Sequence, residues 1–132
     1  MLDHLAVGIP VDKIKESIAF YKAALAPLGY EQRYEFADGN IVGLGSKHDP
    51  LEKKADLWIS ADEGATAGGN NIHYALTAKD RKSVDEFHAA AIAAGGKDNG
   101  APGLREHHPS YYAAYVHDPV GNNIEVVCHI DV

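Results

Sequence analysis

Apolar and polar residues alternate along several short segments of the chain, with the period of two that is typical of half-buried strands. This alternation predicts strands at residues 2–9, 31–36, 40–44, 55–60, 71–77, 111–116 and 124–130. Two longer segments carry apolar residues every three or four positions, which indicates amphipathic helices over about 13–26 and 80–94. Loops at 46–54 and 99–103 and a glycine-rich linker at 63–70 separate these elements.

The order of the elements occurs twice. The segment 20–25 of the first helix (Phe-Tyr-Lys-Ala-Ala-Leu) corresponds to 87–92 of the second (Phe-His-Ala-Ala-Ala-Ile), at an offset of 67 residues. The strands that precede the two helices carry His4 and His73, at an offset of 69 residues. An internal repeat indicates two copies of one structural unit. Each copy consists of a strand and a helix followed by two or three strands.

Strand geometry also predicts which side chains share a face. Successive side chains of a strand point to opposite sides of the sheet. In each of four strands, one alternating set is apolar and suits packing against a helix. The residues between these apolar positions then face away from the helices, and they include His4, Trp58, His73 and Glu125. In a curved sheet, the uncovered surface that carries them would be a cleft.

Composition excludes several classes of protein. The chain is 45% hydrophobic and 23% charged, as in ordinary globular proteins. Its net charge of −7, with no run of Lys or Arg, argues against a nucleic-acid partner. No apolar run is long enough for a membrane span, and no secretory leader follows Met1. The single cysteine, Cys128, cannot form an internal disulfide. We therefore expect a cytoplasmic protein with a small-molecule partner.

Four segments, in this order and spacing, resemble the vicinal oxygen chelate superfamily, which includes glyoxalase I, bleomycin-resistance proteins and extradiol dioxygenases. They are Asp3-His4-Leu5-Ala6-Val7, the helix segment ending in Phe20-Tyr21, Ile72-His73-Tyr74, and Asp118-Pro119-Val120-Gly121-Asn122-Asn123-Ile124-Glu125. The resemblance covers nearly the whole chain. It implies an α+β fold in which two βαβββ modules, at about 1–63 and 71–132, form a curved sheet around a metal-binding cleft. Together they would make a single domain, 1–132.

The metal positions of that superfamily fall on His4, His73 and Glu125. The fourth position, a glutamate in glyoxalase I, falls on Trp58, which lies 67 residues before Glu125 and cannot bind a metal. The resemblance thus implies a divalent ion (Fe, Zn, Ni or Mn) with three protein ligands, and a catalytic role for Glu125. It also argues against typical glyoxalase I activity, because the missing carboxylate would move protons. Two histidines and a carboxylate are the ligands of non-haem iron(II) oxygenases.

Several aromatic residues accompany the candidate ligands. Tyr115 stands ten residues before Glu125, as the active-site tyrosine does in extradiol dioxygenases, which makes it a candidate proton donor. Trp58, Tyr111 and Tyr112 can line a pocket for a planar ligand. His107 can supply an acid or base to that pocket. The second-shell histidine of the dioxygenases has only a loop residue, His48, as its candidate.

Two functions follow from this pattern. The first is a metal-dependent enzyme that acts on a small substrate with vicinal oxygen atoms, as a lyase, an isomerase or a dioxygenase. The alternative is a non-catalytic small-molecule binding or resistance protein of the bleomycin-resistance type. The sequence leaves open whether the two modules pair within one chain or are exchanged in a homodimer.

Overall fold

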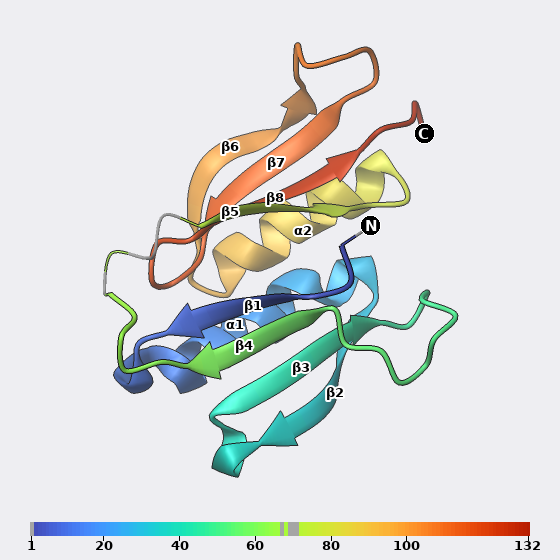
Figure 1. Cartoon of the computed structure of the whole chain (residues 1–132). Coiled ribbons are helices and arrows are strands. Elements are labelled where there is room, and N and C mark those ends of the chain that lie inside the picture. The colour runs from blue at the N-terminus through green and yellow to red at the C-terminus, as the bar shows by residue number, and fades with distance from the viewer. Residues whose placement is uncertain (1, 67, 69–71) are drawn as a thin grey trace.

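The computed structural model describes residues 2–66, 68 and 72–132. Ten strands and α-helices make up two modules of equal plan (Figure 1). Module one contains β1 (Leu5–Ile9), α1 (Ile14–Leu25), β2 (Tyr30–Phe36), β3 (Ile41–Ser46) and β4 (Leu57–Ala61). Module two contains β5 (His73–Thr77), α2 (Arg81–Ala93), β6 (Lys97–Leu104), β7 (Tyr112–His117) and β8 (Asn123–Cys128).

Each module forms a mixed four-stranded sheet. The strand orders are β1-β4-β3-β2 and β5-β8-β7-β6, so equivalent strands occupy equivalent places. The first and last strands of each module pair in parallel, and the other pairs are antiparallel. This topology confirms the predicted α+β fold of two βαβββ modules.

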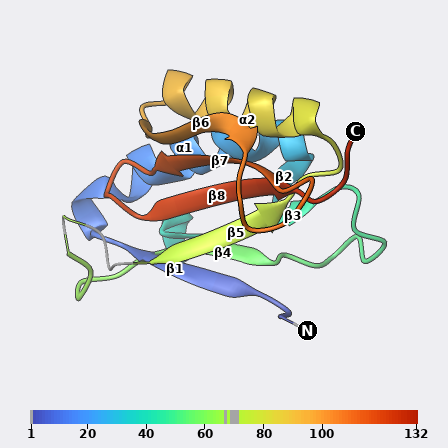
Figure 2. The ribbon, with the colours of Figure 1, turned by 90° about the horizontal axis from the view of Figure 1, so that it is seen from above.

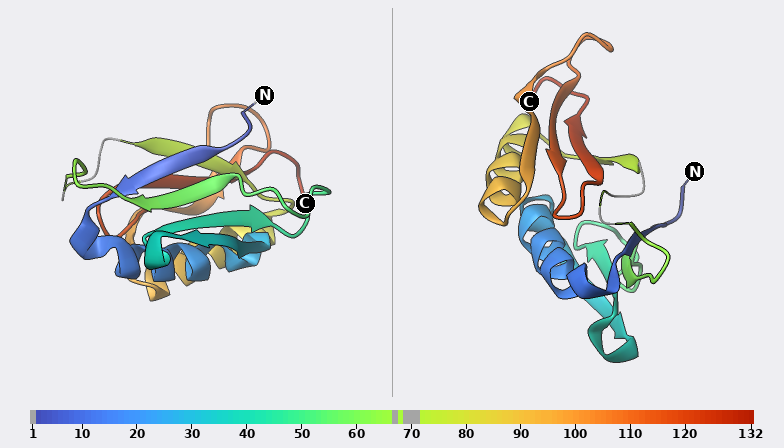
Figure 3. Two further views of the ribbon diagram at one scale, coloured as in Figure 1. Left: turned by 60° about the horizontal axis from the view of Figure 1, so that its bottom comes forward. Right: turned by 90° about the vertical axis from the view of Figure 1, so that its left-hand side faces the viewer.

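Both helices lie on the same side of the sheets and pack against each other, as the right-hand view of Figure 3 shows. The core fills the space between helices and sheets and is continuous across the two modules. Alternate strand residues such as Val7, Ile59 and Ile124 are fully buried there, together with Phe20 of α1 and Phe87 of α2. The opposite side of each sheet carries no helix; we call it the open face (Figure 2).

One element differs from the sequence-based expectation. Residues 99–103, predicted as a loop, lie within β6, which pairs with β7 and shows two register irregularities. Glycine and proline in this segment are typical of loops, but β6 is an edge strand, where a proline costs no inner hydrogen bond. Gly100 also has a φ of 155°, which accommodates the bulge.

The N-terminus of α2 has a side-chain cap, whereas the N-terminus of α1 has none. Asp80 caps α2, because its carboxylate accepts a hydrogen bond from the amide of Ser83 at 2.7 Å. At α1 no side chain forms a cap, because a short 3₁₀ turn at Val11–Lys13 precedes the helix and Asp12 lies within that turn. The predicted linker falls partly on residues outside the described ranges.

A buried hydrogen bond joins the modules. The hydroxyl of Tyr21, in α1, donates to Oδ2 of Asp118 at 2.5 Å, and both residues are buried. Asp118 also accepts from the amides of Val120 and Asn122 and from the side chain of Asn122, which fixes the turn before β8. Burial, followed by the electrostatic effect of the neighbouring Tyr74 and Asp118 side chains, raises the pKa of Tyr21, so its hydroxyl remains a donor at neutral pH.

Among the described helices, none combines the length and apolar character needed to cross a membrane.

The replacement Tyr21→Phe should lower the free energy of unfolding by about 1.5–3 kcal/mol, because a buried carboxylate loses a donor. Urea denaturation followed by circular dichroism measures the change. Tyr112→Phe is the matched control: it removes the exposed hydrogen bond to Asp85 and should cost about 0.5 kcal/mol or less. Equal losses in the two variants would contradict the role of the Tyr21–Asp118 contact.

Candidate functional site

Two predicted site residues meet on the open face of module two. Glu125, in the middle of β8, lies between Ala75 of β5 and Tyr115 of β7. Its Oε2 is 3.1 Å from Nε2 of His73, the first residue of β5. Glu125 is buried, with 4% of its surface exposed, whereas the side chain of His73 is half exposed. The pair therefore presents an imidazole to solvent and a carboxylate just beneath it.

The second oxygen of Glu125 is held by a tyrosine. The hydroxyl of Tyr111 donates a short hydrogen bond to Oε1 of Glu125. Three imidazoles surround the ring of Tyr111 at centroid distances of 4.8, 5.1 and 5.2 Å, from His107, His108 and His129. Burial, and then the hydrogen bond to Glu125, raises the pKa of Tyr111, so the phenol stays protonated and orients the carboxylate.

Tyr115 completes this group. It is the register partner of Glu125, and its ring stacks on that of His73 at a centroid distance of 6.3 Å. The guanidinium of Arg105 lies over the same ring at 5.4 Å. Burial, and then the charge of Glu125, raises the pKa of Tyr115. Its hydroxyl on the open face therefore stays protonated at neutral pH.

His4 does not join these residues within one chain. β1 and β5 lie side by side and run in opposite directions in Figures 1 and 2. His4 directly precedes β1 and His73 opens β5, so the two histidines lie toward opposite ends of the strand pair. The imidazole of His4 instead contacts Asp3, with 2.8 Å between Nδ1 and Oδ1. Over residues 2–66, 68 and 72–132, no three His, Cys, Asp or Glu side chains form a group that could hold a metal.

The residues present fit part of a metal site. Nitrogen and oxygen ligands bind Zn²⁺ at about 2.0–2.2 Å, which places two ligands of one ion roughly 3 Å apart. The separation of 3.1 Å between His73 and Glu125 matches this spacing. Within one chain the pair could thus supply two ligands of an ion, and a third would have to come from elsewhere.

Trp58 lies on the open face of module one. Its indole covers Gly43 of β3, where an added Cβ would come within 2.9 Å of the ring. Two further rings, Tyr34 and Phe36 of β2, stack beside it. Sequence reasoning missed these two residues, although their alternate positions in the strand at 31–36 were a signal that they share a face.

Tyr112 does not lie on the open face, contrary to the prediction that it lines a pocket for a planar ligand. Its hydroxyl donates to Asp85 of α2 at 2.8 Å, and Arg81 of the same helix lies over its ring. Because Tyr111 and Tyr112 are consecutive and Tyr112 opens β7, the two side chains point to opposite sides of the sheet. Only Tyr111 reaches Glu125.

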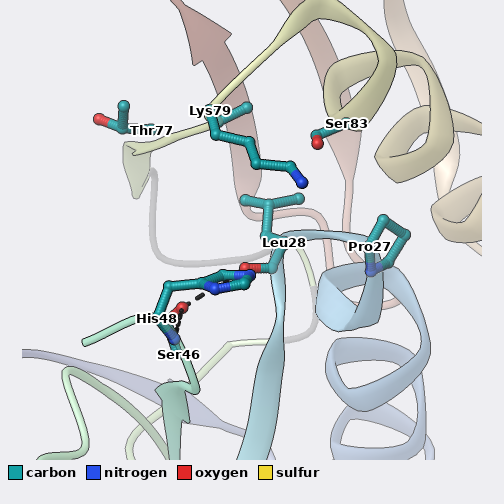
Figure 4. A pocket seen from close by; sticks show the side chains of 8 residues that line it. Pro27, Leu28, Ser46, His48, Thr77, Lys79 and Ser83 are labelled. Carbon is teal, nitrogen blue, oxygen red and sulfur yellow. Dashed lines mark hydrogen bonds between the residues drawn. The ribbon is translucent and has the colours of Figure 1, made fainter. Parts of the chain in front are cut away.

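His48 also lies apart from the candidate site. It lines a cavity of about 250 Å³ at the junction of the modules, between the end of α1 and the start of α2 (Figure 4). Lys79 and Ser83 face it across the cavity. Neither Glu125 nor His73 lines this cavity, so His48 is not placed beside the candidate site.

Comparison with known proteins agrees with this architecture. The sequence model of the Glyoxalase/Bleomycin resistance protein/Dioxygenase superfamily matches residues 1–126. No curated protein matches the chain.

Solved structures with the same fold come from several bacteria. A glyoxalase/bleomycin resistance protein from Albidiferax ferrireducens T118 is 29% identical, with 96% of each chain covered and a TM-score of 0.73. A glyoxalase/bleomycin resistance protein/dioxygenase family enzyme from Burkholderia phytofirmans PsJN is 20% identical, with 98% of each chain covered and a TM-score of 0.72. A lactoylglutathione lyase from Agrobacterium tumefaciens is 19% identical, with 94% of this chain and 91% of that chain covered and a TM-score of 0.61. At these lower identities the last two show the fold alone.

The replacement Tyr111→Phe should destabilise the protein by about 1–3 kcal/mol, because the buried Glu125 carboxylate loses the hydrogen-bond donor at its Oε1 atom. The additional replacement Glu125→Gln should recover part of this loss, since the unpartnered charge is then gone. Urea denaturation of the two single variants and the double variant gives the coupling energy between the residues. Strictly additive effects would contradict a direct Tyr111–Glu125 interaction.

Proposed function

Because the chain belongs to the Glyoxalase/Bleomycin resistance protein/Dioxygenase superfamily, we propose that it is a metal-dependent enzyme acting on a small substrate with vicinal oxygen atoms. The observation that carries this proposal is the 3.1 Å contact between His73 Nε2 and Glu125 Oε2, on a sheet face that no helix covers. An imidazole and a carboxylate at this spacing suit a divalent ion such as Fe²⁺, Zn²⁺, Ni²⁺ or Mn²⁺.

The third ligand in this proposal is His4 of a second copy of the chain. His4 has a half-exposed side chain at the start of an edge strand, and in its own chain it lies away from His73. In a twofold dimer, module one of each copy can lie against module two of the other, which makes two identical sites. Each site would then combine His4 of one copy with His73 and Glu125 of the other.

The residues around the pair have distinct roles. A bound divalent ion supplies Lewis acidity that stabilises an anionic oxygen of the substrate. Tyr111 holds Oε1 of Glu125, so that Oε2 faces His73. Tyr115 presents its hydroxyl next to Glu125 and can donate a proton to a substrate oxygen. Trp58 occupies the position of the fourth ligand of glyoxalase I and supplies no carboxylate for proton transfer. Lyase, isomerase and dioxygenase chemistry all fit this arrangement.

A second candidate function is non-catalytic binding of a small molecule. The aromatic rings at Trp58 favour it, because they offer a ligand contact that needs no metal. Turnover of a substrate panel by metal-loaded protein distinguishes the two functions.

Metal analysis tests the ligand assignment and the sharing of the site together. The purified protein should bind about one divalent ion per chain, and His4→Ala and Glu125→Gln should each lose most of it. Glu106→Gln, which changes a carboxylate in an exposed loop, is the control and should retain the metal.

Mixing the two deficient variants should restore part of the binding. After refolding together, half of the dimers contain both chains, and each of these has one intact site, so the metal content should recover to about one quarter of the wild-type value. A site built within one chain would give no recovery. Unchanged metal content in both single variants would contradict the ligand assignment itself.

Glyoxalase I activity should be poor. With Trp58 in place of a ligand carboxylate, the metal-loaded protein should isomerise the methylglyoxal–glutathione hemithioacetal far more slowly than the turnover of about 1–1000 s⁻¹ that is usual for enzymes. A spectrophotometric assay over several metals measures the rate. Turnover within that range would show that the missing carboxylate is not needed.

A further inference from the structure

We propose that the cavity between the two modules is a binding site for a small monocarboxylate with a short apolar chain. We call it the junction cavity. It is lined by Pro27, Leu28 and His48 of module one and by Ala78, Lys79 and Ser83 of module two. The described residues that line it include neither the candidate metal ligands nor Trp58, so this site does not depend on the proposed metal chemistry.

The volume of the junction cavity sets the size of its ligand. The cavity measures about 250 Å³. Sites for drug-sized molecules measure roughly 300–1,000 Å³, so a smaller molecule is expected here. Because a water molecule in the liquid takes up about 30 Å³, the space corresponds to about eight non-hydrogen atoms. Hexanoate has this size.

The ionisable side chains of the cavity favour an anion. The chain contains 19 acidic and 12 basic residues, yet both ionisable side chains among the described lining residues are basic, His48 and Lys79. They reach the cavity from different modules (Figure 4). The ammonium of Lys79 carries a full charge, and the imidazole of His48 has an N–H donor in either protonation state. A carboxylate bound in the cavity can therefore accept hydrogen bonds from both.

A neighbouring carboxylate, that of Asp80, is turned toward its own helix. Its Oδ1 accepts hydrogen bonds from the amide and the hydroxyl of Ser83, each at 2.7 Å. Its Oδ2 lies 3.9 Å from Nζ of Lys79, which is longer than a hydrogen bond. The ammonium has three N–H donors, so Lys79 keeps donors for a ligand beside this loose contact.

Hydrogen bonds hold both walls of the cavity in place. On module one, the amide of Lys47 donates to the carbonyl of Gly29 at 2.9 Å. The imidazole of His48 lies so close to Gly29 that an added Cβ there would come within 2.8 Å of it. On module two, the amide of Ala78 donates to the carbonyl of Val127 at 2.8 Å. A preformed site lowers the entropic cost of binding, because the walls need no ordering.

Apolar side chains provide a surface for the chain of the ligand. Leu28 and Ala78 are 7% and 5% exposed, and Pro27 lines the same cavity. Each methylene group buried against such a surface raises the affinity about fourfold. Since Pro27 and Leu28 belong to module one and Ala78 to module two, a bound ligand adds contacts across the junction and stabilises the packing of the modules.

Calorimetric titrations with hexanoate, hexanamide and butanoate test the proposal, at constant ionic strength and with EDTA present so that no metal takes part. Hexanamide has the size of hexanoate without its charge and should bind roughly tenfold more weakly. Butanoate lacks two methylene groups and should also bind roughly tenfold more weakly. Hexanoate should raise the melting temperature and shift the NMR signals of the His48 ring and the Ser83 amide.

Three variants locate the binding. Lys79→Gln removes the charge and should weaken hexanoate binding roughly five- to tenfold while leaving hexanamide unchanged. His48→Phe keeps a ring without N–H donors and should weaken hexanoate binding roughly two- to tenfold. Ala78→Leu fills the cavity and should block both ligands. Lys97→Gln, which alters an exposed basic residue of β6, is the control and should bind as the wild type does.

Equal affinity for hexanoate and hexanamide would overturn the proposal, because the site would then not recognise an anion. So would the absence of saturable binding. Unchanged hexanoate binding in both Lys79→Gln and Ala78→Leu would place the ligand elsewhere on the molecule and would overturn it as well. Hexanoate binding that persists in Glu125→Gln, in which the metal is lost, would support the junction cavity even if the proposed metal chemistry failed.

Discussion

The buried hydrogen bond between Tyr21 and Asp118 is the contact on which the geometry of this protein depends. It joins the helix of module one to the turn that leads into β8, across 97 residues of sequence. The same carboxylate accepts three further hydrogen bonds from its own turn, so the point where β8 begins is fixed. Glu125 follows seven residues after Asp118, and its contact with His73 depends on that starting point. In a low-dielectric interior, such a fully satisfied network is rigid.

Much of this arrangement could be predicted from the sequence, because strand alternation is a local property. Leu57 and Ile59 on one side require Trp58 on the other, and the same logic placed Glu125 and His73 on the open face. Residues 99–103 of β6 were predicted as a loop because they contain glycines and a proline, which are typical of loops. They form a strand because they pair with β7. The separation of His4 from His73 depends on how the modules pack, which no local pattern encodes. Tyr112 was wrongly assigned to the pocket because consecutive strand residues face opposite sides of the sheet, and it is Tyr111 that points to the open face.

The two modules share a topology but carry different chemistry on equivalent surfaces. Module two presents a polar group in which Tyr111, Tyr115 and His73 surround one buried carboxylate. Module one presents parallel rings and, at the start of β1, an exposed imidazole. A repeat frees each copy to specialise, since the fold needs only the buried alternate positions. The aromatic residues of module one and the polar residues of module two can therefore be altered separately.

The strand order also has a consequence for how the chain folds during synthesis. In each module the strand made last, β4 or β8, lies inside the sheet, between the strand made first and the strand made just before it. Neither sheet can therefore close by simple addition at an edge. Module one is complete once β4 has been made, but the Tyr21–Asp118 hydrogen bond cannot form until Asp118 follows much later. Until module two packs against module one, the Tyr21 hydroxyl can bond only to water or to its own module, so the docking of the two modules is the step that buries it.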